Sequence, residues 1–321
     1  MAVPTNLYQK ASLKGNREDL LDKIFNTSPT ETPVVSAIGR TTATSDFHEW
    51  QTDALASPNA ANKMIDGDDA SIAAVTPTNR IGNHLQIFNG TVGVSRRANI
   101  VKKAGRGSEM AYLKAKKMVE IKRDIEAMVL SNQAAVAATT SVAGVSGGLG
   151  VQSYVNTSHG VGGSTAAWTS GAPTTAPTSG TGRTFTEALL KTVCQSIFTN
   201  SGQFAEMIVM SPSHKATFSG FAGIASARHE VKGKAQATIV GAADVYVSDF
   251  GALSVVPHWA MVGSTTVHIL NSDYMEMAFL DGFKETPLAK TGDSDKVLIT
   301  ADCALAVRAP SAQGKIADLT A

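Results

Sequence analysis

The longest helical pattern in the chain spans residues 108–133, which contain neither glycine nor proline. Ser108 can cap this helix, and Glu109 places negative charge in the first turn, where the helix dipole favours it. Apolar side chains recur three or four positions apart and predict one narrow buried stripe, made of Ala111, Ala115, Met118, Ile121, Ile125 and Met128. The helix would be about 38 Å long, which is typical of a strut that spans a domain.

An ordinary surface helix explains the same periodicity. In that interpretation the charged residues form solvated pairs four positions apart, such as Lys116–Glu120 and Lys122–Glu126. Each such pair contributes only about 0.2–0.5 kcal/mol to helix stability. The pattern of this segment alone leaves both interpretations open.

Two short helices are predicted before residue 46. Asn16 can cap the first, over residues 16–25, and Pro33 is suited to the first turn of the second. Helices this short are not stable without packing against something larger. Residues 1–45 are therefore predicted to be an arm that lies on another part of the structure.

Two extended segments, 46–55 and 80–95, flank a polar stretch. Val92 and Val94 alternate with small or polar residues, as in a half-buried strand. Asn89-Gly90 could form a hairpin turn, but we favour one long strand with a bulge at Gly90, because a turn there would leave the first segment unpaired. No predicted helix lies nearby to cover this ribbon, so we expect another molecule to cover it.

Residues 134–182 are rich in alanine, glycine, serine and threonine. This composition offers few large apolar side chains and predicts a loop-rich surface. A small apolar anchor is expected within it, formed by Leu149, Val151, Tyr154 and Val155.

Regular structure resumes with Thr184 and Glu187, which have the spacing of a capping box. They predict a helix that ends before Gly202. The apolar segment 207–210 predicts a buried strand, and Ser211, which precedes a proline, predicts the cap of a further helix.

Several more strands follow towards the end of the chain, predicted at 237–241, 244–249, 252–257, 265–270, 274–280, 297–309 and 315–319. Helices and strands mix without the regular alternation of a doubly wound parallel sheet. The predicted fold class is therefore α+β.

Composition limits the classes of partner. The 321 residues are 43% hydrophobic and carry 28 Lys and Arg against 27 Asp and Glu, so nucleic acid or an anionic membrane is not expected as the primary ligand. The first ten residues lack the apolar core of a signal peptide, and no run approaches the roughly 18 apolar residues of a membrane span. We expect a protein that is made and stays in a cytoplasm. Cys194 and Cys303 lack metal or disulfide spacing and are expected to be buried thiols.

No motif supports enzymatic chemistry. Ser146 lies in a Gly-X-Ser-X-Gly match, but the flanking strand and helix of a nucleophile elbow are not predicted there. Asp66-Gly67-Asp68-Asp69 lacks the rest of a calcium loop and is expected to be a polar turn. The histidines are scattered without metal-ligand spacing; they are His48, His84, His159, His214, His229, His258 and His268. We assign no catalytic, cofactor-binding or metal-binding residue and expect no cofactor.

Several phrases occur in one order through nearly the whole chain: SPTETPVVSAIG, HEWQTD, RIGNHLQIF with VGVS, KKAGRGSEMAY running into EIKRDIEA, GGLGVQSYVNT, RTFTEALL, VMSPSHK, DVYVSDFGALSVVPH, LAKTGDSDKVLI and ALAVRAPSAQGKIADL. In these the sequence resembles the major capsid proteins of tailed phages with the Hong Kong 97 fold. The resemblance is greatest to a subfamily once catalogued only as a domain of unknown function. This family has no catalytic motif to carry over.

The resemblance implies a division of the chain into five parts. Residues 1–45 would be an N-terminal arm and 46–95 an extended loop. Residues 96–182 would form a peripheral domain whose spine helix is 108–133, and 183–263 an axial domain. Residues 264–321 would return to the peripheral domain, with the last strand a candidate for the axial sheet.

The implied function is a structural subunit that assembles with itself into hexamers and pentamers of an icosahedral shell around double-stranded phage DNA. It would lie in the virion capsid, and in the bacterial host cytoplasm during assembly. A portal protein, a separate scaffolding protein and a decoration protein are candidate partners, with only weak, non-specific contact to DNA and none to a membrane. The Lys–Asn crosslinks of some relatives cannot be assigned to residues of this sequence.

Two alternatives remain. A compartment that encloses a cargo enzyme can share the same fold, and sequence separates it poorly from a phage shell. A hydrolase built on Ser146 belongs to a different class and is not expected.

Overall fold

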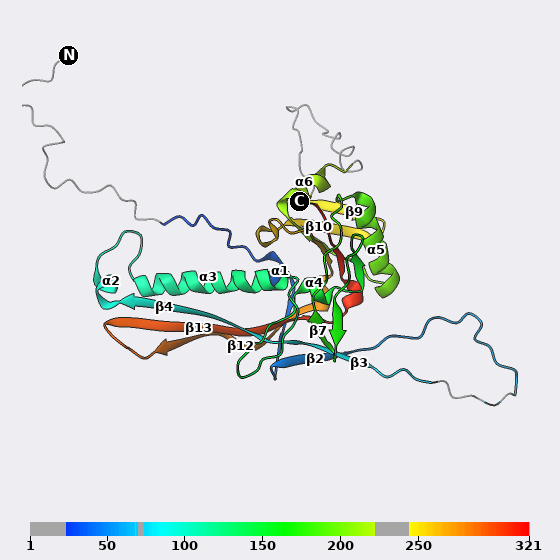
Figure 1. Cartoon of the computed structure of the whole chain (residues 1–321), viewed down its shortest axis with the longest axis horizontal. Helices are drawn as coiled ribbons and strands as arrows, with labels where there is room; N and C mark the ends of the chain where they lie inside the picture. The colour runs from blue at the N-terminus through cyan, green and yellow to red at the C-terminus, as the bar shows by residue number, and fades with distance from the viewer. Residues whose placement is uncertain (1–23, 68, 70–73, 222–243, 321) are drawn as a thin grey trace, which may run out of the picture.

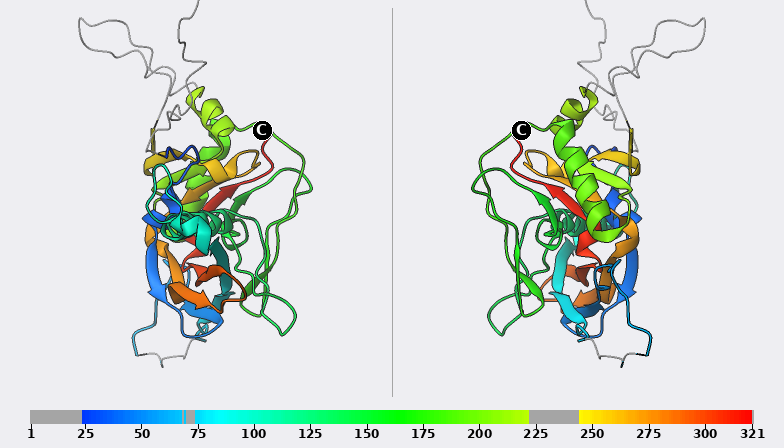
Figure 2. Two further views of the ribbon diagram at one scale, coloured as in Figure 1. Left: turned by 90° about the vertical axis from the view of Figure 1, so that its left-hand side faces the viewer. Right: turned by 90° about the vertical axis from the view of Figure 1, so that its right-hand side faces the viewer.

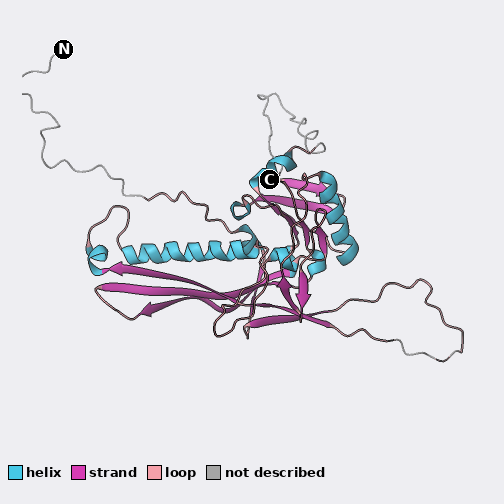
Figure 3. Ribbon diagram, in the orientation of Figure 1, coloured by secondary structure: helices cyan, strands magenta, loops and turns pink. Residues whose placement is uncertain are grey.

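The computed structural model describes residues 24–67, 69, 74–221 and 244–320. Its fold is α+β, as predicted, and it has two packed bodies and a projecting ribbon (Figure 1). The long body is helix α3 (Glu109–Val129) lying along a four-stranded sheet, and the compact body is a six-stranded sheet with two helices. The ribbon pairs β2 (Phe47–Thr52) with β3 (Asn79–His84). Figure 3 shows α3 on one face of the four-stranded sheet.

The long body contains four strands in the order β1 (Gly39–Thr42), β12 (Met275–Leu288), β13 (Ser294–Val307) and β4 (Gln86–Ser95). Helices α1 (Pro33–Ala37) and α2 (Arg96–Ile100) lie beside α3. The short helix predicted to begin at Pro33 is therefore confirmed.

The compact body contains six strands in the order β5 (Asn156–Ser158), β14 (Gly314–Ile316), β11 (Val267–Leu270), β8 (Met207–Met210), β10 (Gly251–Pro257) and β9 (Val245–Ser248). Its helices are α5 (Glu187–Ser201) and α6 (Pro212–Ser219). The segment between the bodies holds α4 (Leu149–Gln152), β6 (Ala167–Thr169) and β7 (Ala172–Thr175), and much of it runs as long loops along one side of the molecule (Figure 2). Three 3₁₀ turns complete the described elements: Trp259–Met261, Ser272–Tyr274 and Pro310–Ala312.

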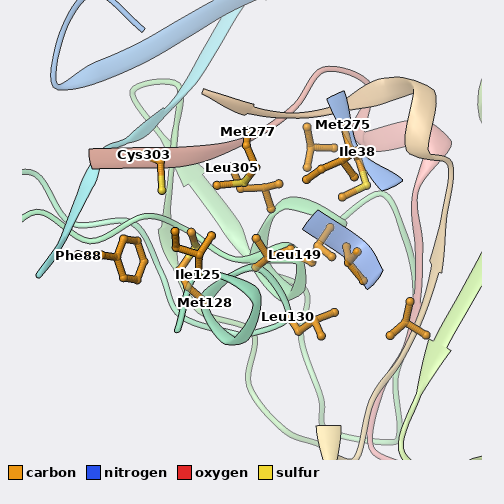
Figure 4. Close-up of a cluster of buried hydrophobic side chains, with 14 of the residues drawn as sticks. Ile38, Phe88, Ile125, Met128, Leu130, Leu149, Met275, Met277, Cys303 and Leu305 are labelled. Atoms are coloured by element: carbon orange, nitrogen blue, oxygen red, sulfur yellow. The ribbon is translucent and has the colours of Figure 1, made fainter. Parts of the chain in front are cut away.

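Helix α3 begins where the sequence predicts. The Ser108 hydroxyl oxygen accepts a hydrogen bond from the Ala111 amide at 3.3 Å, but the helix ends at Val129 and not at residue 133. The apolar stripe predicted on α3 is buried only in the second half of the helix. Ile121, Ile125 and Met128 are buried in the core with the sheet, and Figure 4 shows Ile125 and Met128 there. Ala111 and Ala115 are exposed, because the first half of the helix packs on β4 through other side chains, such as Lys117.

Strand β4 runs through Asn89-Gly90 without a turn, and its pairing with β13 continues residue by residue past this point. The prediction that no turn forms at Gly90 is confirmed. The predicted bulge at Gly90 is wrong, and so is the single long strand over 80–95, because β3 and β4 are separate strands with different partners. A Cβ atom on Gly90 would lie 2.6 Å from Cε of Lys117, so this glycine lets the helix lie close to the strand. The break in the extended segment falls at Leu85 instead, between β3 and β4.

The two faces of β8 explain its continuous apolar sequence. Ile208 and Met210 pack on one side, where Leu190 and Ile197 of α5 lie, while Val209 packs on the other side in the core of the long body. A strand buried on both faces needs apolar residues at every position. The six-stranded sheet therefore separates the core of the long body from the core of the compact body, and β8 contributes side chains to both.

Both cysteines are buried thiols, as predicted. Burial raises the pKa of the Cys194 thiol to about 11, and burial together with the Asp302 carboxylate raises the pKa of Cys303 to about 12. Thiols with such pKa values carry almost no thiolate at neutral pH and are unreactive.

Local predictions in the second half of the chain were correct in part. The capping box of Thr184 and Glu187 is wrong: α5 begins at Glu187 with Thr186 at the N-cap position, and it ends at Gly202 in the left-handed conformation, as expected. Ser211 caps α6 as predicted and accepts the amide hydrogen of His214. In the predicted anchor, Leu149 and Val151 are buried, whereas Val155 is exposed.

Two predicted elements fall on residues outside the described ranges. The first is the helix over 16–25, of which only Ile24 and Phe25 are described, neither in a helix. The second is the strand at 237–241. The prediction for Asp68 also lies outside these ranges, whereas Asp66 and Gly67 form a turn.

His268 lies on β11, fully buried beside Lys315 of β14, its direct partner in the sheet. Burial, and then the Lys315 ammonium, lowers the pKa of His268 to about 3, and the backbone of Leu130 offsets only part of this. The unfolded chain therefore binds a proton below about pH 6.5 that the folded chain binds only near pH 3.

We predict that His268 makes the free energy of unfolding fall as pH drops from about 6.5 towards 3, by up to about 1.4 kcal/mol per pH unit. Chemical denaturation of His268→Phe across this range should show a shallower decline than the wild-type chain. His159→Gln, at a partly exposed position, is the control and should keep the wild-type slope. Equal slopes for His268→Phe and the wild type would contradict the prediction.

Candidate interaction surfaces

The ribbon leaves the body as two paired strands and continues as a long exposed loop. Strands β2 and β3 pair antiparallel from Phe47 opposite His84 to Thr52 opposite Asn79, which confirms the expected pairing for residues 79–84. Residues 86–95 pair with β13 and pack on α3 instead, so the expectation that another molecule covers them is wrong. The described residues of the loop beyond them are exposed, including large apolar ones: Leu55 has 98% of its surface exposed, and Met64, Ile65 and Val75 are also exposed. Exposed apolar side chains gathered on one projection indicate a surface for another molecule.

The root of the ribbon, by contrast, is buried and held by hydrogen bonds. Asn83, near the end of β3, is fully buried. Its Nδ2 lies 2.7 Å from the Leu305 carbonyl, 3.0 Å from the Gly147 carbonyl and 3.1 Å from the Ser146 hydroxyl, and its Oδ1 accepts the Gly147 amide hydrogen at 2.9 Å. One side chain thus joins three segments distant in sequence.

Side chains around Asn83 make the hydrogen bonds to β13 that β4 would make if it continued. Strand β4 ceases to pair with β13 at Cys303, so the backbone groups of Leu305 and Val307 on that side need other partners. Gln152 and Asn83 donate to the Leu305 carbonyl, the Ser146 hydroxyl accepts the Leu305 amide hydrogen at 3.3 Å, and Gln152 accepts that of Val307. We call this group, Asn83, Ser146 and Gln152, the root network.

Ser146, considered in the sequence as a nucleophile, is therefore a buried member of the root network. Its hydroxyl bonds Asn83 and Leu305, and its backbone bonds the side chains of Gln86 and Gln133. No strand-turn-helix elbow surrounds it.

We predict that Asn83→Ala lowers the free energy of unfolding by about 3 kcal/mol, because it leaves buried donors and acceptors without partners. Urea denaturation followed by circular dichroism measures this loss. Asn89→Ala, at an exposed position of the adjoining strand, is the matched control and should change stability by less than about 0.5 kcal/mol. Similar losses in the two variants would show that the root network is not a special source of stability.

A second buried polar contact joins the arm, α3 and the compact body. Glu126 of α3 is fully buried. Its Oε1 and Oε2 accept the amide hydrogens of Val34 and Val35, each at 2.8 Å, and Oε1 lies 2.9 Å from Nε2 of His258. Since the Ala260 amide donates to Nδ1 of His258, the ring hydrogen is on Nε2, which donates to the carboxylate. We call Glu126, His258 and the first turn of α1 the arm junction.

The arm junction caps the N-terminus of α1, which the residues next to it in sequence do not. Thr32 stands at the N-cap position of α1 without a side-chain bond, and Glu126 satisfies the free amides in its place. The predicted solvated pair Lys122–Glu126 is wrong for this reason, whereas Lys116–Glu120 forms at 4.0 Å. The junction is extended by Trp259, whose Nε1 donates to the Glu31 carbonyl at 2.8 Å.

We predict that Glu126→Gln destabilises the protein by about 3 kcal/mol and loosens the arm, because an amide has one acceptor oxygen and turns a donor towards another donor. Limited proteolysis near residues 24–32 should be faster, and the denaturation midpoint should fall. Glu120→Gln, on the same helix and partly exposed, should leave both unchanged. Unchanged proteolysis in Glu126→Gln would contradict this role.

The remaining histidines do not gather into a site. His48 and His84 lie on the ribbon strands, where burial lowers the pKa of each ring, and His214 bonds Ser211 and the Thr320 carbonyl. His229 lies outside the described residues. Within the described ranges, no group of three histidine, cysteine or carboxylate side chains could hold a metal ion. None of the helices in those ranges is long and apolar enough to span a membrane.

The sequence and the fold of this chain are similar to those of known proteins. The sequence model of the SU10 major capsid proteins matches residues 5–320. The chain belongs to this family. A major capsid protein of Escherichia phage Phieco32 is 39% identical over 134 residues, which is 42% of this chain and 38% of that relative, so the match spans well under half of the relative's length.

The capsid fold extends over the whole chain. A chain of the cyanophage A-1(L) capsid asymmetric unit is 14% identical, with a TM-score of 0.67 over 99% of this chain and 100% of that one. A chain from Gordonia phage Cozz is 8% identical, with a TM-score of 0.61 over 100% and 99%. The fold of this capsid protein is therefore of the Hong Kong 97 type, as the resemblance in the sequence implied.

Proposed function

We propose that this chain is the structural subunit of an icosahedral phage shell, assembled as hexamers and pentamers around double-stranded DNA. The observation that carries the proposal is the contrast within the ribbon. Its root is held by buried hydrogen bonds, while its loop presents exposed Leu55, Met64 and Ile65. The root fixes where the loop leaves the body, and burial of the loop's apolar side chains on a neighbouring subunit would remove them from water.

The parts of the fold suggest a role for each. We assign the long body to the peripheral domain, the compact body to the axial domain around the capsomer axes, and residues 1–45 to an arm that reaches an adjacent subunit. Strand β4 pairs with β13, which confines the extended loop to the residues before 86. Strand β14 lies in the six-stranded sheet, which favours the axial sheet for the last strand.

The partners follow from the same proposal. Each subunit would contribute an arm and a loop to its neighbours, so modest pairwise contacts add up over a closed shell. The near-neutral net charge, +1, suits weak, non-specific contact with packaged DNA. A separate scaffolding protein, a portal and a decoration protein would complete assembly in the host cytoplasm. A subunit with this role needs no catalytic residue.

We predict that replacing residues 58–78 by a short Gly-Ser linker leaves a folded subunit that no longer closes into shells. The structure places Asn79 in β3, so the replacement ends at residue 78 to keep the strand pair. Electron microscopy and sedimentation of the wild-type protein should show hollow particles, and the variant should sediment as subunits or capsomers with wild-type circular dichroism.

Two outcomes would count against the proposal. Complete particles formed by the shortened variant would remove the loop from the assembly contacts. A wild-type chain that stays monomeric under all conditions tried, including those of phage growth, would exclude the shell function itself.

A further inference from the structure

Charge is balanced over the chain but segregated along the long body. Residues 96–106, which form α2 and the loop to α3, contain no acidic residue. They carry five cationic side chains: Arg96, Arg97, Lys102, Lys103 and Arg106. We call this segment the basic elbow, and it lies at one end of the long body (Figure 1).

Only part of this charge is neutralised within the chain. Arg96 pairs with Asp293 at 2.9 Å, and Lys103 and Arg106 share the carboxylate of Glu109. Arg97 and Lys102 are exposed and form no ion pair with any described residue. Two aliphatic side chains lie between them with most of their surface exposed, 69% for Ile100 and 56% for Val101.

An excess of the opposite charge lies where the four-stranded sheet meets the ribbon. Asp281 of β12 is directly opposite Asp302 of β13, and the pairing register shifts on both sides of Asp281. Like charges in this arrangement repel. Burial, then Asp281, then Asp46, raises the pKa of Asp302. We call these three aspartates the acidic waist.

Two members of the acidic waist, Asp46 and Asp302, form no ion pair with any described residue, and only Asp281 has a cationic partner. Oδ1 of Asp302 is buried without a hydrogen-bond partner among the described residues, and an unsatisfied buried acceptor is costly. Lys284 approaches only Asp281, at 3.5 Å, and its side chain is exposed. Ile87, opposite Asp302 on β4, is 66% exposed, so the waist, like the elbow, combines charge with an exposed aliphatic side chain.

The two patches cannot neutralise each other within one chain. The β4–β13 pairing places Ser294 opposite Ser95, beside the elbow, and Asp302 opposite Ile87. The eight residue steps from Ser294 to Asp302 span about 26 Å of extended strand, several times the length of an arginine side chain. The sheet holds the patches apart, so the elbow cannot reach the waist of its own chain, whereas the elbow of another copy can.

We propose that the basic elbow of one copy of this chain binds the acidic waist of a second copy, with Arg97 and Lys102 facing Asp281 and Asp302. The inference rests on the proposed shell function, because that function supplies the second copy. Each copy would use a different patch from its partner, and contacts of this head-to-tail kind close into rings or continue into larger arrays.

The first test separates a contact between copies from a role in folding. Asp302→Asn keeps the shape of the side chain and removes its charge, so the isolated subunit should melt at a higher temperature because repulsion within the waist is relieved. The same variant should assemble less well, with the half-assembly concentration raised about threefold or more. A structural role alone would move both quantities in the same direction. Assembly at the wild-type concentration would contradict the proposal.

The second test reverses the charges on exposed residues. Arg97→Glu with Lys102→Glu, and separately Asp46→Lys with Asp281→Lys, should each raise the half-assembly concentration about tenfold or more, since like charges then meet across the interface. Combining all four changes in one chain should restore assembly. Lys116→Glu with Lys122→Glu, on exposed positions of α3, gives the same charge change as the elbow variant and should assemble normally.

Failure of the combined variant to assemble would overturn the pairing. So would a loss of assembly on reversal of the waist but not of the elbow, because the cation would then come from another protein. An elbow variant that forms complete shells but packages less DNA would identify the elbow as a DNA contact instead.

A third measurement does not depend on closed shells. Equimolar Lys102→Cys and Asp281→Cys chains, oxidised together, should form a dimer on a non-reducing gel, whereas either variant alone should not, since Cys194 and Cys303 are buried. Absence of this dimer from particles that do assemble would overturn the contact alone. Absence of wild-type particles while the dimer still forms would count against the shell function and leave the contact in place.

Discussion

The way in which the arm, α3 and the compact body are joined depends on one buried carboxylate. Glu126 lies on the face of α3 that meets the arm and the compact body, and it satisfies two backbone amides and one imidazole that are otherwise buried without partners. A buried carboxylate is tolerated only when its oxygens are bonded, so the three elements can meet in essentially one arrangement. This constraint sets where the arm leaves the body and how the two bodies are joined.

The ribbon likewise has two parts, a root held by buried hydrogen bonds and an exposed loop. At its root, side chains of the root network take over the hydrogen bonds that a continuing strand would make to Leu305 and Val307. Farther out, the described residues of the loop are exposed, including large apolar side chains. Buried polar groups are directional and specify geometry, whereas apolar surface is not directional and suits contacts made only in an assembly.

The distribution of charge is a third feature that bears on contacts between copies. Opposite charges of nearly equal number keep net repulsion between copies small, and in the proposed contact the basic elbow of one copy meets the acidic waist of the next. The β12–β13 hairpin, which carries Asp281 and Asp302, shares an apolar core with the second half of α3 (Figure 4).

The sequence alone determined features that depend on neighbours along the chain. The cap at Ser108, the proline start of α1, the glycine end of α5 and the pairing of two extended segments follow from local hydrogen bonding and periodicity, and the family resemblance came from the order of short phrases. Only the tertiary structure decided what Asn83, Gly90 and Glu126 do. Glu126 looks like one more surface carboxylate and Gly90 like a bulge, because the groups that define their roles, at Val34 and Lys117, are far away in sequence. Burial and partner choice over such distances are set by packing, which no local pattern records.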